Sequence, residues 1–197
     1  MTDMRLLTAG IACTMLFANA AIAQTQARQA GSQTGRTVIP TLPSCQGRKS
    51  PVTLQILTNA SSGWTMNGSP AAAMSVAGWA NASPAQWIGA SDVGATSVTY
   101  VVHFNTPFPH GAMTVSAQWA ADNCGTGLQG GTGTIQLIGP CYAGNKDFMY
   151  FNHYAASSFA PADIGNPQPA ITFSTSNESS SAAGLAGIFT VTAQCRR

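Results

Sequence analysis

The sequence carries very little charge. Eight lysines and arginines and six acidic residues make up 7% of its 197 residues, against about 25% in a typical soluble domain. Long surface helices are therefore not expected, because their wet faces usually carry Glu, Lys and Arg. The net charge of +2 comes without a cluster of basic residues. This excludes a nucleic-acid-binding protein that relies on contacts with the phosphate backbone.

Groups for acid–base chemistry are also scarce. The chain has three histidines, five aspartates and one glutamate. His103, His110 and His153 lie in different segments, and no G-x-S-x-G motif is present. A pair of placed carboxylates, as a glycosidase needs, is not evident either. We predict that the protein is not an enzyme, with no catalytic residue, no metal and no cofactor.

What the chain has instead is uncharged polarity, with 39 Ser and Thr and 22 Asn and Gln. Such residues suit exposed strands and loops. Hydrophobic residues alternate with a period of two over 96–104, 112–121 and 189–193, which indicates half-buried strands. Shorter strands are expected at residues 52–57, 64–67, 74–76, 86–88, 134–138, 148–151 and 171–174, and helical turns at 71–73 and 154–162.

Gly and Pro residues separate these segments, as they do in all-β domains. About ten short strands with one wet face each predict an antiparallel β-sandwich of the jelly-roll kind. We expect one such domain over residues 41–197.

The N-terminal segment is typical of a secretory signal peptide. An apolar run over residues 6–18 is followed by Ala21-Ile22-Ala23, which places cleavage before Gln24. A membrane anchor would need a longer apolar run, and a lipoprotein site at Cys13 lacks the usual Leu-led box. We expect a signal peptide over residues 1–23, a flexible leader over 24–40, no membrane span in the mature chain, and a secreted or periplasmic location.

Removal of the signal peptide leaves four cysteines. An even number in an exported chain argues for two disulfides, and four cysteines allow three pairings. We favour Cys45–Cys195, which would join the two ends of the domain, and Cys124–Cys141, which would close a glycine-rich loop. A zinc site is disfavoured because no C-x-x-C spacing exists.

Residues 78–88, GWANASPAQWI, resemble part of a module found in exported bacterial β-sandwich proteins, many of which carry a PEP-CTERM sorting tail. The likeness continues at residues 100–104, a Tyr-x-x-x-Phe strand, and at 119–123, which end in Ala-Asp-Asn. It implies a jelly-roll or galactose-binding-like sandwich in a secreted or surface protein. The sorting tail itself is not seen here, and the cysteines are not part of the pattern.

Four residues are candidates for ligand contact. Trp79 and Trp87 could stack on a sugar ring, although Trp is also a common core residue of sandwiches. Asp122 and Asn123 could bind calcium or a sugar, although an Asx turn at a strand end is the simpler interpretation.

These observations favour a non-catalytic extracellular module, structural or adhesive, that acts through its surface. A carbohydrate-binding module is the first alternative, and a small exported hydrolase is the second. The expected partners are a glycan or a cell surface, or further copies of the chain. Two coplanar Trp rings on an exposed sheet face would favour the carbohydrate-binding alternative.

Overall fold

The computed structural model describes residues 37–94, 96–107, 110–139, 141, 146–178 and 181–195. The predicted signal peptide and residues 24–36 of the predicted leader lie outside this part of the chain. Residues 37–40, which the sequence placed in the leader, contact the domain. The Val38 amide donates to the Ser61 carbonyl, and the Asn105 amide donates to the Pro40 carbonyl at 2.8 Å.

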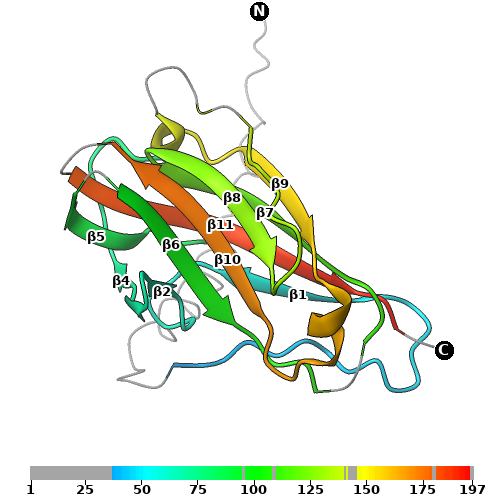
Figure 1. The fold of residues 1–197 in the computed structure, drawn as a ribbon. Helices are drawn as coiled ribbons and strands as arrows, with labels where there is room; N and C mark the ends of the chain where they lie inside the picture. Colours follow the sequence, from blue (N-terminus) through cyan, green and yellow to red (C-terminus); the bar gives the residue numbers. More distant parts are fainter. Residues whose placement is uncertain are drawn as a thin grey trace, which may run out of the picture. The chain divides into compact units, whose positions relative to one another are not determined.

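The described chain folds into two sheets, and all pairings between its named strands are antiparallel. One sheet has six strands in the order β4-β5-β11-β7-β9, with β1 also paired to β11. The other has five strands in the order β3-β2-β6-β10-β8. Figure 1 shows β6, β10 and β8 as one layer in front of β11, β7 and β1. The antiparallel β-sandwich predicted from the sequence is therefore confirmed.

The strands are β1 (Val52–Leu57), β2 (Thr65–Met66), β3 (Ser69–Pro70), β4 (Ala72–Ala73), β5 (Ile88–Val93), β6 (Thr96–His103), β7 (Met113–Asp122), β8 (Cys124–Gly130), β9 (His153–Ser158), β10 (Ala170–Asn177) and β11 (Ser181–Ala193). Two short 3-10 helices, η1 (Asp147–Met149) and η2 (Pro161–Gly165), complete the described elements. No helix of the described chain is long and apolar enough to cross a membrane.

The core lies between the two sheets and follows the period of two. Every second residue of β6 from Val98 and of β7 from Met113 is buried. Aromatic rings fill the middle, where Phe173 lies edge-on to both Trp119 and Phe189, with ring centroids 5.2 and 5.9 Å apart. Such contacts add specific geometry to the hydrophobic gain of burial.

Several short predictions were wrong. Residues 74–76 and 134–138 form no named strand, although Gln136 makes one bridge to Leu128. Residues 148–151 begin in η1 rather than in a strand, and 71–73 include strand β4 rather than a helical turn. Residues 154–162 hold most of β9 and only the beginning of η2.

The glycine-rich segment predicted as a loop is strand β8. Its glycines make room for two aromatic rings, because a Cβ at Gly125 would overlap the ring of Trp119 in β7 and one at Gly130 would overlap the ring of Phe159, which follows β9. Residues without side chains carry no alternation, so the period-two pattern could not reveal this strand.

Both disulfides have the pairing that the sequence favoured. Cys45 is bonded to Cys195, with Cα atoms 5.2 Å apart, and Cys124 to Cys141, with Cα atoms 5.4 Å apart. The first closes the domain between the segment before β1 and the end of β11. The second ties the start of β8 to the segment before η1.

Candidate functional site

The outer face of the six-stranded sheet has two distinct halves. Its β11–β7 pairs run from Ala186–Ala120 through Ile188–Gln118 to Thr190–Ser116 and Thr192–Thr114. We call the end with the alanines the covered half and the end with the hydroxyl residues the open half. The same two strands thus supply a small apolar surface at one end and a polar surface at the other.

Two indole rings lie on the covered half. Trp79 and Trp87 belong to a second hydrophobic cluster, outside the main core, that includes Ala120 and Ala186. A Cβ on Gly184 would overlap the Trp79 ring, so the strand needs glycine there to admit the ring.

The two rings contact one another, with centroids 4.4 Å apart and planes inclined by 53°. Trp87 is 7% exposed, and its indole N–H donates to the Ala80 carbonyl at 2.9 Å. Trp79 is half-buried and also contacts Phe148. They therefore do not form a coplanar exposed pair, and the geometry gives them a packing role. Ligand contact by either ring stays a prediction.

The open half carries one prominent aromatic residue, Tyr154 of β9, which is 72% exposed. Across the ladder it pairs with Gln118 of β7, which pairs in turn with Ile188 of β11. The Gln118 side-chain amide donates to the Phe151 carbonyl at 3.0 Å, which holds its orientation. A shallow groove of about 500 Å³ lies here, lined by Ser116, Ala117, Gln118, Tyr154, Ala155, Ala156, Ile188 and Thr190.

Two further depressions continue this groove along β9. One of about 360 Å³ shares Ser116 and Ala156 with the groove. Another of about 450 Å³ shares Tyr154, Ala155 and Ala156 with it and reaches the segment at residues 136–139. The described residues that line the three depressions include no Asp, Glu, Lys or Arg, and His153 lines the last of them. Together they make an extended, uncharged strip whose side chains offer hydroxyl and amide groups.

Asp122 and Asn123 connect β7 of one sheet to β8 of the other. Asn123 holds this corner: its side-chain oxygen accepts from the Glu178 amide at 3.2 Å, and its own amide donates to the Ser176 carbonyl at 3.0 Å. The side-chain hydrogen bond joins residues 55 positions apart, so it is a long-range contact and differs from the local Asx turn that the sequence suggested. A ligand role for Asn123 stays a prediction.

Asp122 is 5% exposed, and its carboxyl makes no hydrogen bond to another described residue. Burial raises the pKa of Asp122 to about 6. Burial, and then the nearby Asp122 charge, raise the pKa of Tyr100 well above its usual range. No second carboxylate of the described chain joins Asp122 in a group of three or more metal-ligating side chains. A calcium role for Asp122 stays a prediction.

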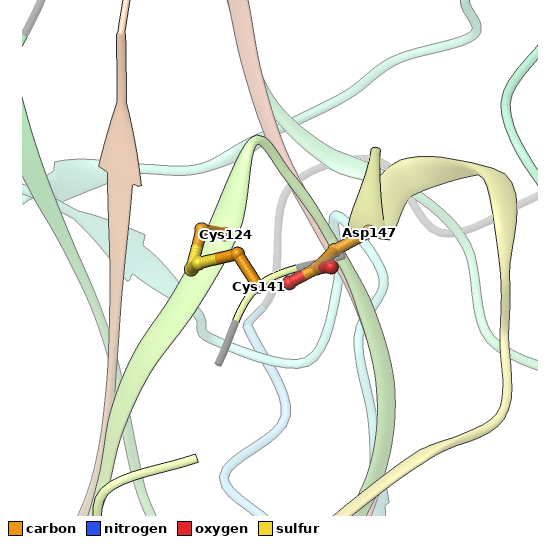
Figure 2. A group of neighbouring side chains, drawn as sticks. All are labelled: Cys124, Cys141 and Asp147. Atoms are coloured by element: carbon orange, nitrogen blue, oxygen red, sulfur yellow. A yellow bond between two sulfur atoms is a disulfide. The ribbon is translucent and has the colours of Figure 1, made fainter. Parts of the chain in front are cut away.

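Such a group does exist one strand further along, at the Cys124–Cys141 disulfide. The two sulfur atoms and a carboxylate oxygen of Asp147 lie within 4.8 Å of one another. Figure 2 shows the Asp147 carboxylate pointing toward the disulfide. Asp147 is 1% exposed, and its Oδ2 accepts from the Gly125 amide at 3.4 Å.

His153 completes this corner. Its Nε2 lies 3.9 Å from Oδ1 of Asp147, and its ring stacks on Trp119 with centroids 4.4 Å apart. Burial lowers the pKa of His153, and the Asp147 charge opposes that shift. His103 is exposed on β6, and the buried His110 lies with its Nε2 3.4 Å from the Pro43 carbonyl. The three histidines are thus in three different surroundings.

Two of these features were missed from the sequence. The sequence predicts a helical turn at Tyr154, whereas the residue lies in strand β9, beside the open half. Asp147 lies only six residues from Cys141, but no C-x-x-C or similar spacing marks them as a group. Close reading of the spacing could have paired Asp147 with the nearer cysteine, whereas Cys124 joins them only through the fold.

Of the known proteins, solved structures alone include one that is similar to this chain. No family model matches the sequence, and neither does any curated protein. Among solved structures, the chain is similar to CsCBM6-3 from Clostridium stercorarium, which was determined in complex with cellobiose. The two are 20% identical, and the match covers 68% of this chain and 89% of that chain with a TM-score of 0.31. A similarity of this size does not transfer a function.

Proposed function

We propose that the protein is an exported, non-catalytic adhesive module that binds a neutral polysaccharide along the open half of its six-stranded sheet. The observation that carries this proposal is the uncharged strip beside β9 with the 72% exposed Tyr154 at its centre. Sugars present C–H faces that pack on aromatic rings and hydroxyl groups that pair with amides and hydroxyls.

The composition of the strip selects the class of ligand. Ser116, Gln118 and Thr190 supply donors and acceptors without a formal charge. An anionic polymer would need Lys or Arg as partners, because a charge brought to a surface without a counter-charge loses hydration energy. A neutral polyhydroxylated chain has no such requirement.

The shape of the strip favours a chain over a small molecule. β9 has six residues, and at roughly 3.3 Å per residue it extends for about 20 Å. The three depressions share residues along this length. A polymer could contact all of them at once, so that several weak contacts add up.

Two disulfides support a place outside the cytoplasm, because such bonds persist in oxidising compartments. The predicted signal peptide agrees with this location. Membership in the family of modules that the sequence resembles also remains a proposal.

Association through strand edges is less favoured. Beside β8, Leu128 and Gln136 exchange two backbone hydrogen bonds of 3.0 and 2.9 Å. The Ser157 hydroxyl of β9 donates to the Thr134 carbonyl at 2.6 Å. The segment around residues 134–136 therefore lies along β8 and β9, the strands at the edges of the two sheets, where a second copy of the chain could otherwise pair.

The test is retention of the mature protein on insoluble cellulose, chitin and xylan, with alginate gel as the anionic comparison. We expect binding to at least one neutral polymer, unchanged in 0.5 M NaCl. Tyr154→Ala should weaken it about tenfold or more, whereas Tyr154→Phe keeps the ring and most of the affinity. The control is Tyr150→Ala, which removes a 45% exposed tyrosine outside the strip and should leave polysaccharide binding unchanged.

Circular dichroism and urea unfolding of each variant would show that the fold is intact, since Tyr154 is exposed and should contribute less than about 0.5 kcal/mol to stability. Binding to no neutral polymer, binding only to alginate, or equal loss in the Tyr150 and Tyr154 variants would contradict the proposal. Oligomers in size-exclusion chromatography without any polysaccharide binding would favour a self-associating structural module instead.

A further inference from the structure

We propose that the Cys124–Cys141 bridge is also a latent metal site: once a dithiol reduces the bridge, the two thiolates and the Asp147 carboxylate bind one Zn²⁺ ion. The proposal is independent of polysaccharide binding, because these three side chains, at the start of β8, before η1 and in η1, do not line the strip beside β9.

The donor set has the chemistry that Zn²⁺ prefers. Zn²⁺ is bound by Cys thiolates at about 2.3 Å and by carboxylate oxygens at about 2.0–2.2 Å. Three protein ligands are enough for a tetrahedral site with an open fourth position. The soft thiolates also discriminate against Ca²⁺ and Mg²⁺, which take oxygen ligands.

The distances are nearly those of a formed site. Ligands of a tetrahedral Zn²⁺ lie roughly 3.3–3.8 Å apart, given the bond lengths above. The three donor atoms already lie within 4.8 Å of one another. The sulfur atoms would move apart on reduction, toward the separation that the metal requires, and the carboxylate would approach by about 1 Å.

The carboxylate is held in place from behind. Gly125, next to Cys124, donates its amide to Oδ2 of Asp147, and the Asp147 amide donates to the Asn123 carbonyl at 3.3 Å. Oδ1 lies 3.9 Å from Nε2 of His153. Partners of this kind orient a metal ligand before the ion arrives.

The redox step balances with a dithiol as reductant. A thiolate of the dithiol attacks the sulfur of Cys141, which is less buried than Cys124, and Cys124 leaves as a thiolate. The second thiol of the reagent then displaces Cys141, and the reagent departs as a disulfide. Two electrons and two protons pass to the protein, and both protons leave again when Zn²⁺ binds the thiolates.

The experiment uses the mature protein with Cys45→Ala and Cys195→Ala, so that Cys124 and Cys141 are the cysteines left to react. After reduction by a dithiol and its removal, Zn²⁺ is titrated against a chromophoric chelator. Co²⁺ serves as a second probe, because thiolate ligation gives it a charge-transfer band. We expect one Zn²⁺ per chain, a thiolate–Co²⁺ band, and a Tm that rises with Zn²⁺ in the reduced form only.

Asp147→Asn is the sharpest variant, since it keeps the size of the side chain and removes its charge. It should weaken Zn²⁺ at least tenfold in the reduced protein. The comparison protein, Cys124→Ser with Cys141→Ser and the other bridge intact, should bind none. Absence of Zn²⁺ binding, equal affinity in the Asp147→Asn variant, or equal binding by the oxidised protein would each overturn the proposal. A reduced protein that unfolds and does not refold with Zn²⁺ would overturn it as well.

Discussion

The covered and open halves of the outer sheet face are built from the same strands, yet other parts of the chain pack onto one half and leave the other open. Around Ala120 and Ala186 the strands carry small residues, and two indole rings pack onto them. Around Ser116 and Thr190 they carry hydroxyl groups and remain open as a groove. The difference shows that the aromatic residues most suggestive of sugar binding, Trp79 and Trp87, lie where the chain folds over its own sheet. The part of the outer face that stays open is the part without tryptophan.

Truncation of Trp87 should have the largest effect on stability. Trp87→Ala removes a buried indole and the hydrogen bond to Ala80, and we expect a loss of about 3–5 kcal/mol. Urea unfolding followed by circular dichroism would measure it. A loss below about 1 kcal/mol would mean that the covered half is not packed as a second core, and the contrast between the halves would disappear.

A matched pair of substitutions on β11 tests the same contrast within one strand. Gly184→Val should lower the unfolding free energy by about 1–3 kcal/mol, because its side chain would overlap the Trp79 ring. Thr190→Val, in the open half, should change it by about 0.5 kcal/mol or less. Equal effects, measured by the same urea titration, would show that the two halves tolerate added bulk alike.

A smaller effect than that of Gly184→Val is expected at Asp122, which pairs with Gly184 at the covered end. Burial raises the pKa of its carboxyl in the folded protein to about 6 from an ordinary value of 3.8. Folding therefore favours the protonated form. The contribution is fully present below about pH 4 and is lost as the pH rises through 6, so ionised Asp122 opposes folding at pH 7.

Asp122→Asn should consequently raise the unfolding free energy at pH 7 by about 1–2 kcal/mol. The full pKa difference would correspond to about 3 kcal/mol, and solvent near this corner screens part of it. The measurement is the difference in unfolding free energy between parent and variant, taken at pH 4 and at pH 7. His153 makes stability rise with pH, but this contribution is the same in both proteins and cancels in the difference. A difference that does not grow with pH would show that Asp122 ionises freely in the folded protein.

The sequence predicted the sandwich because alternation is strong wherever one face of a strand is buried. Residues 52–57 coincide with β1, and 96–104 and 112–121 match β6 and β7 to within one residue at each end. The pairing of the cysteines also followed from chain ends and loop length. These features depend on local pattern and simple topology, which the sequence carries directly.

The sequence could not predict what depends on contacts across the fold. β8 is hidden because its glycines accommodate Trp119 and Phe159 of other elements. β9 has the sequence HYAASS, which shows no clear alternation, and its strand conformation comes with pairing to β7. For the same reason the exposure of Tyr154 was not visible, since it follows from which edge β9 occupies. Burial of Trp87 was equally a matter of where residues 74–87 fold back.

The bond between Cys45 and Cys195 gives the domain a mechanical property. It joins residues 150 positions apart whose Cα atoms are 5.2 Å from one another. Strands β1 and β11, which follow the first cysteine and precede the second in the sequence, pair with each other. Tension applied to the chain before Cys45 and after Cys195 would pass through this covalent link. The two sheets would bear almost none of the load. If the protein acts as the adhesive module proposed above, pulling at its ends would leave the open half of the sheet in its folded shape.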